Sequence, residues 1–317
     1  MDVERAHEER KHEKYEALIE ACRSLPPIRT AVAHPCDESS LAGTLSAAKA
    51  GLIEPILVGP QGRIRALAAS IHHDLAPYRL IDAPHSHASA EKAVALVRAG
   101  EANALMKGSL HTDELMAEVM HKETGLRTAR RLSHVFIMDV PTYSKTLFIT
   151  DAAVNIFPSL EDKADIVQNA VDLARALGVD RPKVAILSAV ETITSKIPST
   201  IDAAALCKMA DRGQITGAVL DGPLALDNAI SRDAAAVKQI DSPVAGDADI
   251  LVAPDMEAGN MLAKELTFLA NADAAGIVLG ARAPIILTSR ADSARTRMAS
   301  CAVAALYAHA RRGAARS

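Results

Sequence analysis

Several chemically active side chains are grouped between residues 106 and 113, where an apolar strand is expected to end and a helix to begin. The segment reads Met106-Lys107-Gly108-Ser109-Leu110-His111-Thr112-Asp113. It combines a cation, a glycine that lets another backbone approach closely, hydroxyl groups and a histidine, ahead of a helix that Thr112 would cap. Such a set is suited to binding a phosphate at a helix N-terminus. The alternative interpretation is an ordinary capped turn with a surface lysine.

A second polar group follows the apolar run 284–288. This run is expected to be a buried strand that delivers Ser289 and Arg290 to the edge of a sheet, and Asp292 or Ser293 would then cap a long helix. An arginine there offers a fixed charge and a planar fork toward phosphate or a developing oxyanion. A helix cap beside a solvated arginine is the alternative interpretation.

Two further junctions of this kind carry polar residues. The segment 252–260 has Asp255 and Asn260 at a helix start, and the segment 220–229 forms a long turn that contains Asp221. In open α/β sheets, ligands bind beyond the carboxyl ends of the strands. All four junctions are therefore candidate binding positions.

The elements that would position these junctions are apparent along most of the chain. Short β-branched runs alternate with longer amphipathic runs rich in Ala and Leu. The predicted strands are 30–34, 55–59, 78–82, 104–107, 135–140, 146–150, 183–188, 217–221, 250–253, 276–279 and 284–288. The predicted helices are 41–52, 64–73, 90–99, 115–121, 160–177, 202–211, 259–269 and 294–311. This alternation indicates βαβ units, and hence an α/β fold with a mostly parallel sheet and helices on both faces.

One pair of predicted strands breaks the parallel pattern. Residues 135–140 and 146–150 are separated only by Pro141-Thr142-Tyr143-Ser144-Lys145, which is too short for a crossover helix, so they predict an antiparallel hairpin. A new series of βα units begins near residue 151, and the apolar stripe of the last helix needs a partner surface. We therefore predict a discontinuous first domain, residues 1–150 plus 290–317, and a second domain, residues 151–289.

Composition excludes several classes of function. Of the 317 residues 49% are hydrophobic, which is enough for sizeable cores and about two domains. The 35 basic and 39 acidic residues give a net charge of -4, and aromatic residues make up 3%. The basic footprint and the stacking platforms of nucleic-acid-binding proteins are therefore missing. The four cysteines form no C-x-x-C pair, which argues against a zinc knuckle or a disulfide framework.

No segment predicts secretion or membrane insertion. Residues 1–11 are too charged for the apolar part of a signal peptide, and no apolar run approaches the roughly 20 residues that span a bilayer. We therefore expect a cytoplasmic protein without a membrane or nucleic-acid partner.

The motifs of several common enzyme classes are absent from the sequence. There is no G-x-x-x-x-G-K-[ST], G-x-G-x-x-G, G-x-S-x-G or H-E-x-x-H. His72 and His73 are adjacent on a predicted helix, so their rings would not face one metal together. Kinase, Rossmann dehydrogenase, serine hydrolase and zinc protease interpretations lose their main support, and we predict no metal site.

Taken together, the junctions resemble the phosphate acetyl/butyryltransferase (phosphotransacylase) family. The matching segments run in the family's order over roughly residues 30 to 310, and they are similar to the phosphotransacylase unit that some bacteria fuse behind an enoyl-CoA hydratase domain. They are Lys107-Gly108-Ser109-Leu110-His111-Thr112, Asp151-Ala152-Ala153-Val154-Asn155, Asp221-Gly222-Pro223-Leu224 with Asp227, Pro243-Val244-Ala245-Gly246 followed by Pro254-Asp255, Gly259-Asn260, and Ser289-Arg290.

The resemblance implies a fold and a reaction. The fold would be the two-domain architecture of isocitrate and isopropylmalate dehydrogenases, with an interdomain cleft and a homodimer formed by the second domain. The reaction would be acyl-CoA plus phosphate giving acyl phosphate plus CoA, reversibly, with CoA as a substrate and no metal or other cofactor. The site in the cleft would hold Lys107, Ser109, Ser289 and Arg290 around one phosphate.

The chemistry of that reaction suggests roles for the matching residues. Attack of the CoA thiol on the acyl phosphate develops an oxyanion, which Arg290 and a second cation would stabilise. Ser289 would hydrogen-bond the thiol or the carbonyl oxygen. The candidates for this second cationic group are Lys107 and one of the two arginines, Arg130 or Arg131. The substrate-binding residues that the resemblance implies are Lys107, Gly108, Ser109, His111, Thr112, Arg131, Asn155, Asp221, Pro254, Asp255 and Asn260.

The sequence does not identify the residue that accepts the proton of the thiol. In acetyl-specific relatives an Asp follows the Ser-Arg pair by several residues, whereas here only Asp292 is acidic. A carboxylate that caps a helix has a depressed pKa and is a poor base. We therefore expect the cationic site around Arg290 to favour the thiolate, and the departure favours the butyryl-type branch.

Two alternative functions stay open. A metal- and NAD-dependent dehydrogenase, of the isocitrate or hydroxythreonine-phosphate type, would share the fold but would need clustered Asp or His ligands. A non-catalytic protein that binds acyl-CoA or acyl phosphate would keep the site and lack the base. Phosphate-dependent release of free CoA would separate the enzyme from the binding protein.

Overall fold

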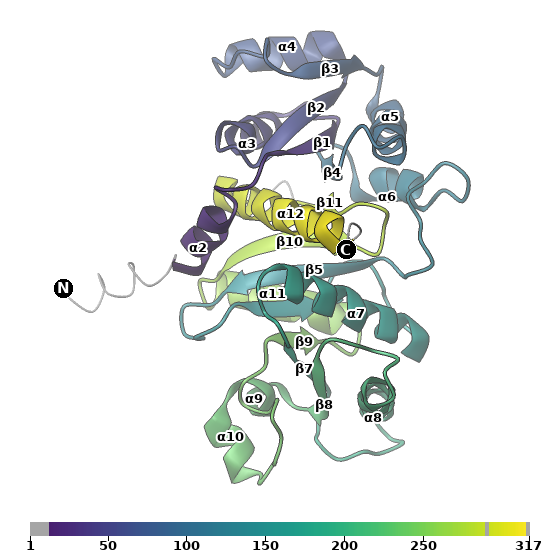
Figure 1. Ribbon diagram of the computed structural model, residues 1–317, viewed down its shortest axis with the longest axis vertical. Helices are drawn as coiled ribbons and strands as arrows, with labels where there is room; N and C mark the ends of the chain where they lie inside the picture. Colours follow the sequence, from purple (N-terminus) through teal and green to yellow (C-terminus); the bar gives the residue numbers. More distant parts are fainter. Residues whose placement is uncertain (1–12, 289–291, 315–317) are drawn as a thin grey trace, which may run out of the picture. The chain divides into compact units, whose positions relative to one another are not determined.

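Strands and helices alternate along the chain in the computed structural model, which describes residues 13–288 and 292–314 (Figure 1). The strands are β1 (Ile28–Ala33), β2 (Ile53–Gly59), β3 (Arg79–Asp82), β4 (Ala104–Lys107), β5 (Ser133–Asp139), β6 (Leu147–Thr150), β7 (Lys183–Leu187), β8 (Val219–Leu224), β9 (Ile250–Val252), β10 (Asp273–Leu279) and β11 (Ile285–Ile286). Each predicted strand overlaps one of them. The α/β class and the mostly parallel strands are confirmed.

The predicted helices are also present, but most begin earlier than predicted. The helices are α2 (Glu13–Ala21), α3 (Glu38–Lys49), α4 (Gln61–Ser70), α5 (Ser86–Arg98), α6 (Thr112–Met120), α7 (Leu160–Ala176), α8 (Pro198–Asp211), α9 (Leu226–Ile230), α10 (Arg232–Val237), α11 (Met256–Phe268) and α12 (Ala294–Ala314). Within the described ranges, none of them has the length and apolar character needed to cross a membrane.

Polar capping residues explain the early starts of α3, α5 and α11, whereas α4, α6 and α8 begin without a capping side-chain bond. Asp37 accepts a hydrogen bond from the Ser40 N–H ahead of α3, and His85 accepts one from the Ala88 N–H ahead of α5. A cap satisfies N–H groups that have no partner inside the helix. The apolar periodicity begins only after these polar residues, so it located the helices and missed their first turns.

The chain divides into two compact units. We call Arg131–Ala274, to which the start of the chain up to Lys14 is also assigned, the central unit, and Tyr15–Arg130 with Ala275–Ser317 the terminal unit. The change of unit therefore falls at Arg131, earlier than the predicted boundary at residue 150, and the return falls at Ala275 rather than at residue 290. One reason is that the β5–β6 hairpin joins β9 in the central unit. The predicted domains, 1–150 plus 290–317 and 151–289, stay a prediction.

The terminal unit contains strands in the order β3-β2-β1-β4-β11-β10, all parallel except β10. Figure 1 shows α3 and α5 on opposite sides of the β1–β2 strands. The parallel pairing of β4 with β11 aligns Leu105 with Ile285 and Met106 with Ile286. The residues that follow, Lys107 and Leu287, therefore leave the sheet at the same edge.

The last helix packs against α3 in the terminal unit, as the apolar stripe of residues 294–311 had suggested. Gly43 of α3 makes room for Arg297 of α12, because a Cβ there would lie 2.7 Å from Arg297 Cδ. Ser293 Oγ accepts a hydrogen bond from the Thr296 N–H at 3.1 Å. Ser293 thus caps this helix.

The central unit contains strands in the order β5-β6-β9-β7-β8. The predicted hairpin is confirmed: β5 and β6 are antiparallel, with Val135 opposite Thr150 and Met138 opposite Leu147. Strands β6, β9, β7 and β8 are parallel, and their apolar residues pack with α11 into a core that includes Ile149, Leu187 and Leu251.

Candidate active site

Lys107 ends β4 with its side chain folded over the loop that follows. Its Nζ donates hydrogen bonds to the carbonyl oxygens of Gly108 at 3.3 Å and Leu110 at 3.1 Å, and the residue is only 5% exposed. These bonds hold the ammonium group at the carboxyl end of the parallel strands. Ligands of α/β proteins bind at such edges.

The loop after β4 is fastened to the loop after β1. The N–H of Gly108 donates to Ala33 O and that of Ser109 to His34 O, both at 2.9 Å. A Cβ on residue 108 would lie 2.4 Å from Ala33 O, so this approach requires glycine. The Ser109 hydroxyl donates to His34 O at 2.8 Å and accepts from the Cys36 N–H at 3.1 Å. The predicted phosphate ligand Ser109 is thus hydrogen-bonded within the chain.

His111 and Thr112 lie exposed at the start of α6. Thr112 is the first helical residue and His111 occupies the cap position without a capping side-chain bond, so the expectation that Thr112 caps the helix was wrong. Asp113 and Glu114 follow in the first turn. Their negative charges already complement the positive end of the helix dipole, which makes this N-terminus less attractive to an anion.

The predicted catalytic pair, Ser289 and Arg290, lies outside the described residues. The segment that leads to it is described as far as Thr288, which is buried and accepts a hydrogen bond from Arg297 Nη1 at 3.0 Å. Arg297 also donates through Nη2 to Ser39 Oγ at 2.8 Å. Because β11 pairs with β4, this segment begins at the sheet edge where Lys107 lies.

His34 at the same edge was missed by the sequence analysis. It follows β1 directly, with a φ of 56°, and is 8% exposed. Its Nδ1 lies 3.0 Å from Ser89 Oγ, and that hydroxyl donates to His85 O at 2.8 Å. Burial, with Arg63 nearby, lowers the pKa of His34 below its ordinary value. The strand-to-helix criterion applied to the other junctions would have found it.

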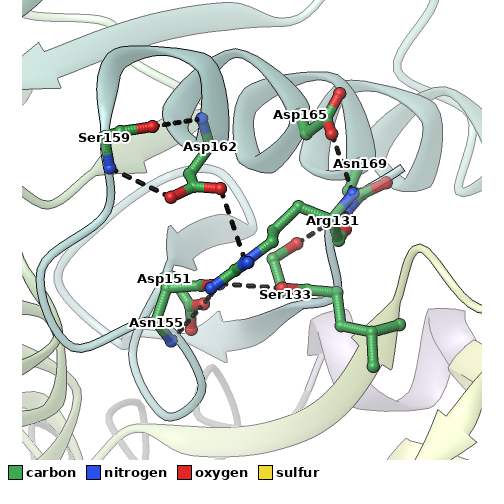
Figure 2. A network of polar contacts seen from close by, with 9 residues as sticks. Arg131, Ser133, Asp151, Asn155, Ser159, Asp162, Asp165 and Asn169 are labelled. Atoms are coloured by element: carbon green, nitrogen blue, oxygen red, sulfur yellow. Dashed lines mark hydrogen bonds and ion pairs between the residues drawn. The ribbon is translucent and has the colours of Figure 1, made fainter. Parts of the chain in front are cut away.

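In the central unit the loop after β6 is organised around a buried carboxylate (Figure 2). Asp151 accepts hydrogen bonds from the N–H groups of Ala153, Val154 and Asn155 at 3.0 to 3.2 Å, and from the N–H of His134 at 3.2 Å. Hydrogen bonds from N–H groups to a carboxylate are shorter and stronger than those between neutral groups. Asp151 therefore holds the loop in one conformation.

Both the nitrogen and the oxygen of the Asn155 side-chain amide form hydrogen bonds within the chain. Its Nδ2 donates to Asp151 Oδ2 at 2.5 Å and to Leu132 O at 2.7 Å, and its Oδ1 accepts from Arg131 Nε at 2.7 Å. Arg131 also lies 3.4 Å from Asp162 Oδ1, and about half of its side chain is exposed. Figure 2 shows the guanidinium lying between Asn155 and Asp162.

The start of α11 packs against the same loop. Asn260 Nδ2 donates to Ala152 O at 3.0 Å, and a Cβ on Gly259 would lie 2.3 Å from Asp151 O. Asp255 caps α11 by accepting from the Ala258 N–H at 2.9 Å, and the half-buried Pro254 precedes it. The structure thus brings four predicted residues to this loop: Asn155, Pro254, Asp255 and Asn260.

Asp221 is not among them. It lies on β8, which is separated from β9 by β7, and its Oδ1 accepts a hydrogen bond from the adjacent Gly222 N–H at 2.8 Å. Its place on this more distant strand could not be read from the sequence.

His134, a second histidine that the sequence analysis missed, lies on β5 with 2% of its surface exposed. Within the described chain its Nδ1 has no hydrogen-bond partner. Burial lowers its pKa to about 4, although the nearby Asp151 acts in the opposite direction. The ring packs edge-on against Phe136, 4.4 Å between centroids. We interpret it as a neutral core residue.

Known proteins match this chain along most of its length. A family model described as "Phosphate acetyl/butaryl transferase" matches residues 85–305. A phosphate acetyltransferase of Rhizobium meliloti is 68% identical over 301 residues, which cover 95% of each chain. A phosphate butyryltransferase of Clostridium acetobutylicum is 44% identical over 294 residues, covering 93% of this chain and 98% of the relative.

A solved structure agrees with the sequence matches. A branched-chain phosphotransacylase from Enterococcus faecalis V583 superposes with a TM-score of 0.77 at 32% identity, covering 89% of this chain and 99% of that one. The α/β fold and these matches define an acyltransferase. The chain belongs to the phosphate acetyl/butyryltransferase family, as its strand-to-helix motifs had indicated.

Proposed function

We propose that this protein transfers a short acyl group reversibly between CoA and inorganic phosphate. Membership of the family supports the reaction. We place the active site at the carboxyl end of β4 because β4 pairs in parallel with β11. This pairing gives the Lys107 loop and the segment leading to Ser289 and Arg290 a common sheet edge.

Cationic side chains at this edge of the sheet would stabilise the negative charge that the reaction develops. Thiol attack on an acyl phosphate creates an oxyanion, and the phosphate then leaves with additional charge. Arg290 would stabilise both through its planar donors, with Lys107 as the second cation and Ser289 as a hydrogen-bond donor. Gly108 and Ser109 would hold the loop, whereas His111 and Thr112 would contact the substrate, since their side chains are exposed.

The central unit would contribute to substrate binding mainly through Arg131. Its half-exposed guanidinium keeps donors beyond the one bonded to Asn155, which suits a phosphate. Asn155, Pro254, Asp255 and Asn260 would act by shaping the 151–155 loop, and Asp221 by contacting substrate from its own strand. All five stay substrate-binding proposals.

We propose the two-domain fold of isocitrate and isopropylmalate dehydrogenases, because each compact unit has its own helices on mostly parallel strands. A homodimer through the central unit is supported by exposed apolar side chains on or just after α11, namely Met261, Phe268 and Leu269. We further propose a cytoplasmic enzyme that uses CoA as a substrate and needs no metal. A fused enoyl-CoA hydratase domain, as in some relatives, stays an expectation.

For the acyl group, we propose acetyl-CoA as the first substrate to test. The acetyltransferase of R. meliloti is more similar to this chain than the butyryltransferase of C. acetobutylicum is, at 68% against 44% identity. Asp292 alone follows Arg290 closely, and this departure from acetyl-specific relatives favours the butyryl branch. The two observations point to different chain lengths, so the assay must cover both.

The test measures release of free CoA thiol from acetyl-, propionyl- and butyryl-CoA, with phosphate or arsenate as the acceptor. We expect anion-dependent release with at least one of the three. CoA binding without release would favour the non-catalytic alternative. Substrate-dependent reduction of NAD with a divalent metal, in the absence of thiol release, would favour the dehydrogenase.

A further inference from the structure

His34 lies at the proposed site, and the roles described so far leave it unused. It occupies the carboxyl end of β1, between β2 and β4 in the sheet. Its carbonyl oxygen accepts hydrogen bonds from both the N–H and the hydroxyl of Ser109. The backbone of His34 and the Lys107 loop are therefore fixed to each other.

The backbone conformation of His34 is unusual for a residue with a side chain. Its φ of 56° lies in the left-handed region, which disfavours most side chains and is adopted most readily by Gly and, among other residues, by Asn, Asp and His. Such conformations occur preferentially at functional sites, where the surrounding structure maintains them. Here the bonds to Ser109 maintain it.

The imidazole is held in one orientation and one tautomer. Ser89 Oγ donates its proton to His85 O, so its oxygen is left to accept from His34 Nδ1–H. Nε2 is then the unprotonated nitrogen, and it makes no hydrogen bond with any residue in the described ranges. An oriented imidazole with a lone pair on Nε2 is the usual form of a histidine general base.

Burial, together with the neighbouring charges, holds the pKa of His34 below its ordinary value. Burial is the largest influence and lowers its pKa, and Arg63 of α4 and His85 ahead of α5 act in the same direction. Glu114 of α6 and Asp37 ahead of α3 oppose them. The net shift is downward, so the ring is available to accept a proton.

We propose that His34 Nε2 accepts the proton of the CoA thiol during attack on the acyl phosphate. The S–H bond breaks as the proton moves to Nε2, the sulfur forms a bond to the carbonyl carbon, and the carbon–oxygen bond to phosphate breaks. Phosphate leaves with the electron pair of that bond. In the reverse direction the imidazolium returns the proton to the departing thiolate. This inference rests on the proposed function and its site.

A base is useful here because thiols ionise weakly at neutral pH. With a pKa of about 8.5, only about 3% of a thiol is thiolate at pH 7. General-base catalysis typically contributes about 10²- to 10⁴-fold in rate. The benefit of a base should therefore disappear as the pH rises past the pKa of the thiol.

The test compares His34→Asn with the wild-type chain between pH 5.5 and 9.5, using acetyl phosphate and CoA. Asparagine tolerates the left-handed backbone and its amide can still donate to Ser89, but it has no basic nitrogen. The matched control is His85→Asn, an exposed neighbour, because asparagine also caps helices well.

We expect His34→Asn to lower kcat about 100-fold or more at pH 7, and the deficit to shrink several-fold or more by pH 9.5. The acidic limb of the wild-type profile should vanish, and added imidazole should restore part of the activity. His85→Asn should stay within about twofold of wild type. If His34→Asn folds poorly, Ser89→Ala should show the same recovery at high pH, because it releases the imidazole from its fixed tautomer.

A wild-type-like kcat in His34→Asn at pH 7 would overturn the proposal. So would an equal loss at pH 7 and pH 9.5 without imidazole rescue, which would indicate a structural role. Failure of the underlying function would look different, since wild type would then consume no CoA thiol with acetyl phosphate and release none from acyl-CoA. Full activity of Lys107→Met would show that the site itself is elsewhere.

Discussion

The loop after β4 and the loop after β6 both follow the carboxyl end of a buried strand, and both are rich in polar residues. In the β6 loop, the carboxylate of Asp151 accepts the backbone N–H groups, and both ends of the Asn155 amide are bonded within the chain. The β4 loop, in contrast, is held largely by backbone hydrogen bonds to the β1 loop. His111, Thr112 and His34 Nε2 are left for other partners.

This difference shows what a polar junction means physically. Carboxylate and amide side chains can replace the missing backbone partners of a loop, in which case they are structural. Where backbone bonds hold the loop, polar side chains are available to a ligand. We therefore expect substitutions in the β4 loop to lower turnover, and those in the β6 loop to lower stability.

The largest effect is expected from Lys107→Met, which keeps the bulk of the side chain and removes its charge. The loss of a donor at a developing oxyanion typically costs 10²- to 10³-fold, so we expect kcat/KM to fall up to about 10³-fold. Thiol release assays measure it, with the exposed Lys122→Met as the control. A fall in melting temperature with unchanged turnover would make the β4 loop structural, like the β6 loop.

Acid should destabilise the protein through His134, because burial holds its pKa below the ordinary value in the folded state. Its pKa is about 4 when folded against an ordinary 6.5. The unfolded chain binds the proton first, so this stability is complete above pH 6.5 and is lost as the pH falls to about 4. Urea unfolding of His134→Phe should show a flatter dependence over that interval. An unchanged slope would exclude His134 as the source.

Arg290→Lys should lower kcat about 100-fold, with a smaller change in KM. Lysine keeps the charge but loses the planar fork that can hold phosphate and a carbonyl oxygen together. A contact that strengthens as charge develops acts on kcat more than on KM. Steady-state kinetics with varied CoA would measure both constants. Turnover like that of wild type would mean that this arginine is merely solvated.

Asp151→Asn should lower the free energy of unfolding by about 2 kcal/mol, since hydrogen bonds to a charged acceptor typically contribute 1.5 to 3 kcal/mol. One amide oxygen cannot replace a carboxylate that accepts from several N–H groups. The kcat of the folded variant should change little. Asp180→Asn, on the exposed surface, is the control for chemical denaturation. A large loss of kcat at normal stability would instead assign Asp151 to the substrate.

The smallest effect concerns the cap of α12. Ser293→Ala should cost about 1 kcal/mol, because it removes the acceptor for the Thr296 N–H. Asp292→Asn should leave kcat nearly unchanged, since the proton acceptor proposed here is His34. Abolished turnover in Asp292→Asn at an unchanged melting temperature would identify Asp292 as the base.

Local pattern was sufficient for the described strands, for the longer helices after residue 40 and for the family, but not for α2, α9 and α10, which were not predicted. Apolar periodicity located every strand, and the short gap at 141–145 predicted the antiparallel β5–β6 hairpin, because both signals are carried by neighbouring residues. The order of the strand-to-helix motifs identified the family, as the matches to known acyltransferases confirm. The starts of α3, α5 and α11 were predicted late, because polar capping residues precede the apolar periodicity.

Only the tertiary structure decided which polar side chains are hydrogen-bonded within the chain and which are available to a ligand. The pairing of Leu105 with Ile285 joins segments far apart in the chain, and no local pattern reports such a contact. Asn155 was expected to bind substrate, but its amide is satisfied by Arg131 and Leu132, which only the folded loop brings within reach. His34 stands in the sequence as an ordinary residue after a strand. Its tautomer depends on the hydroxyl of Ser89 on α5, which is distant in the sequence but lies 3.0 Å away in the fold.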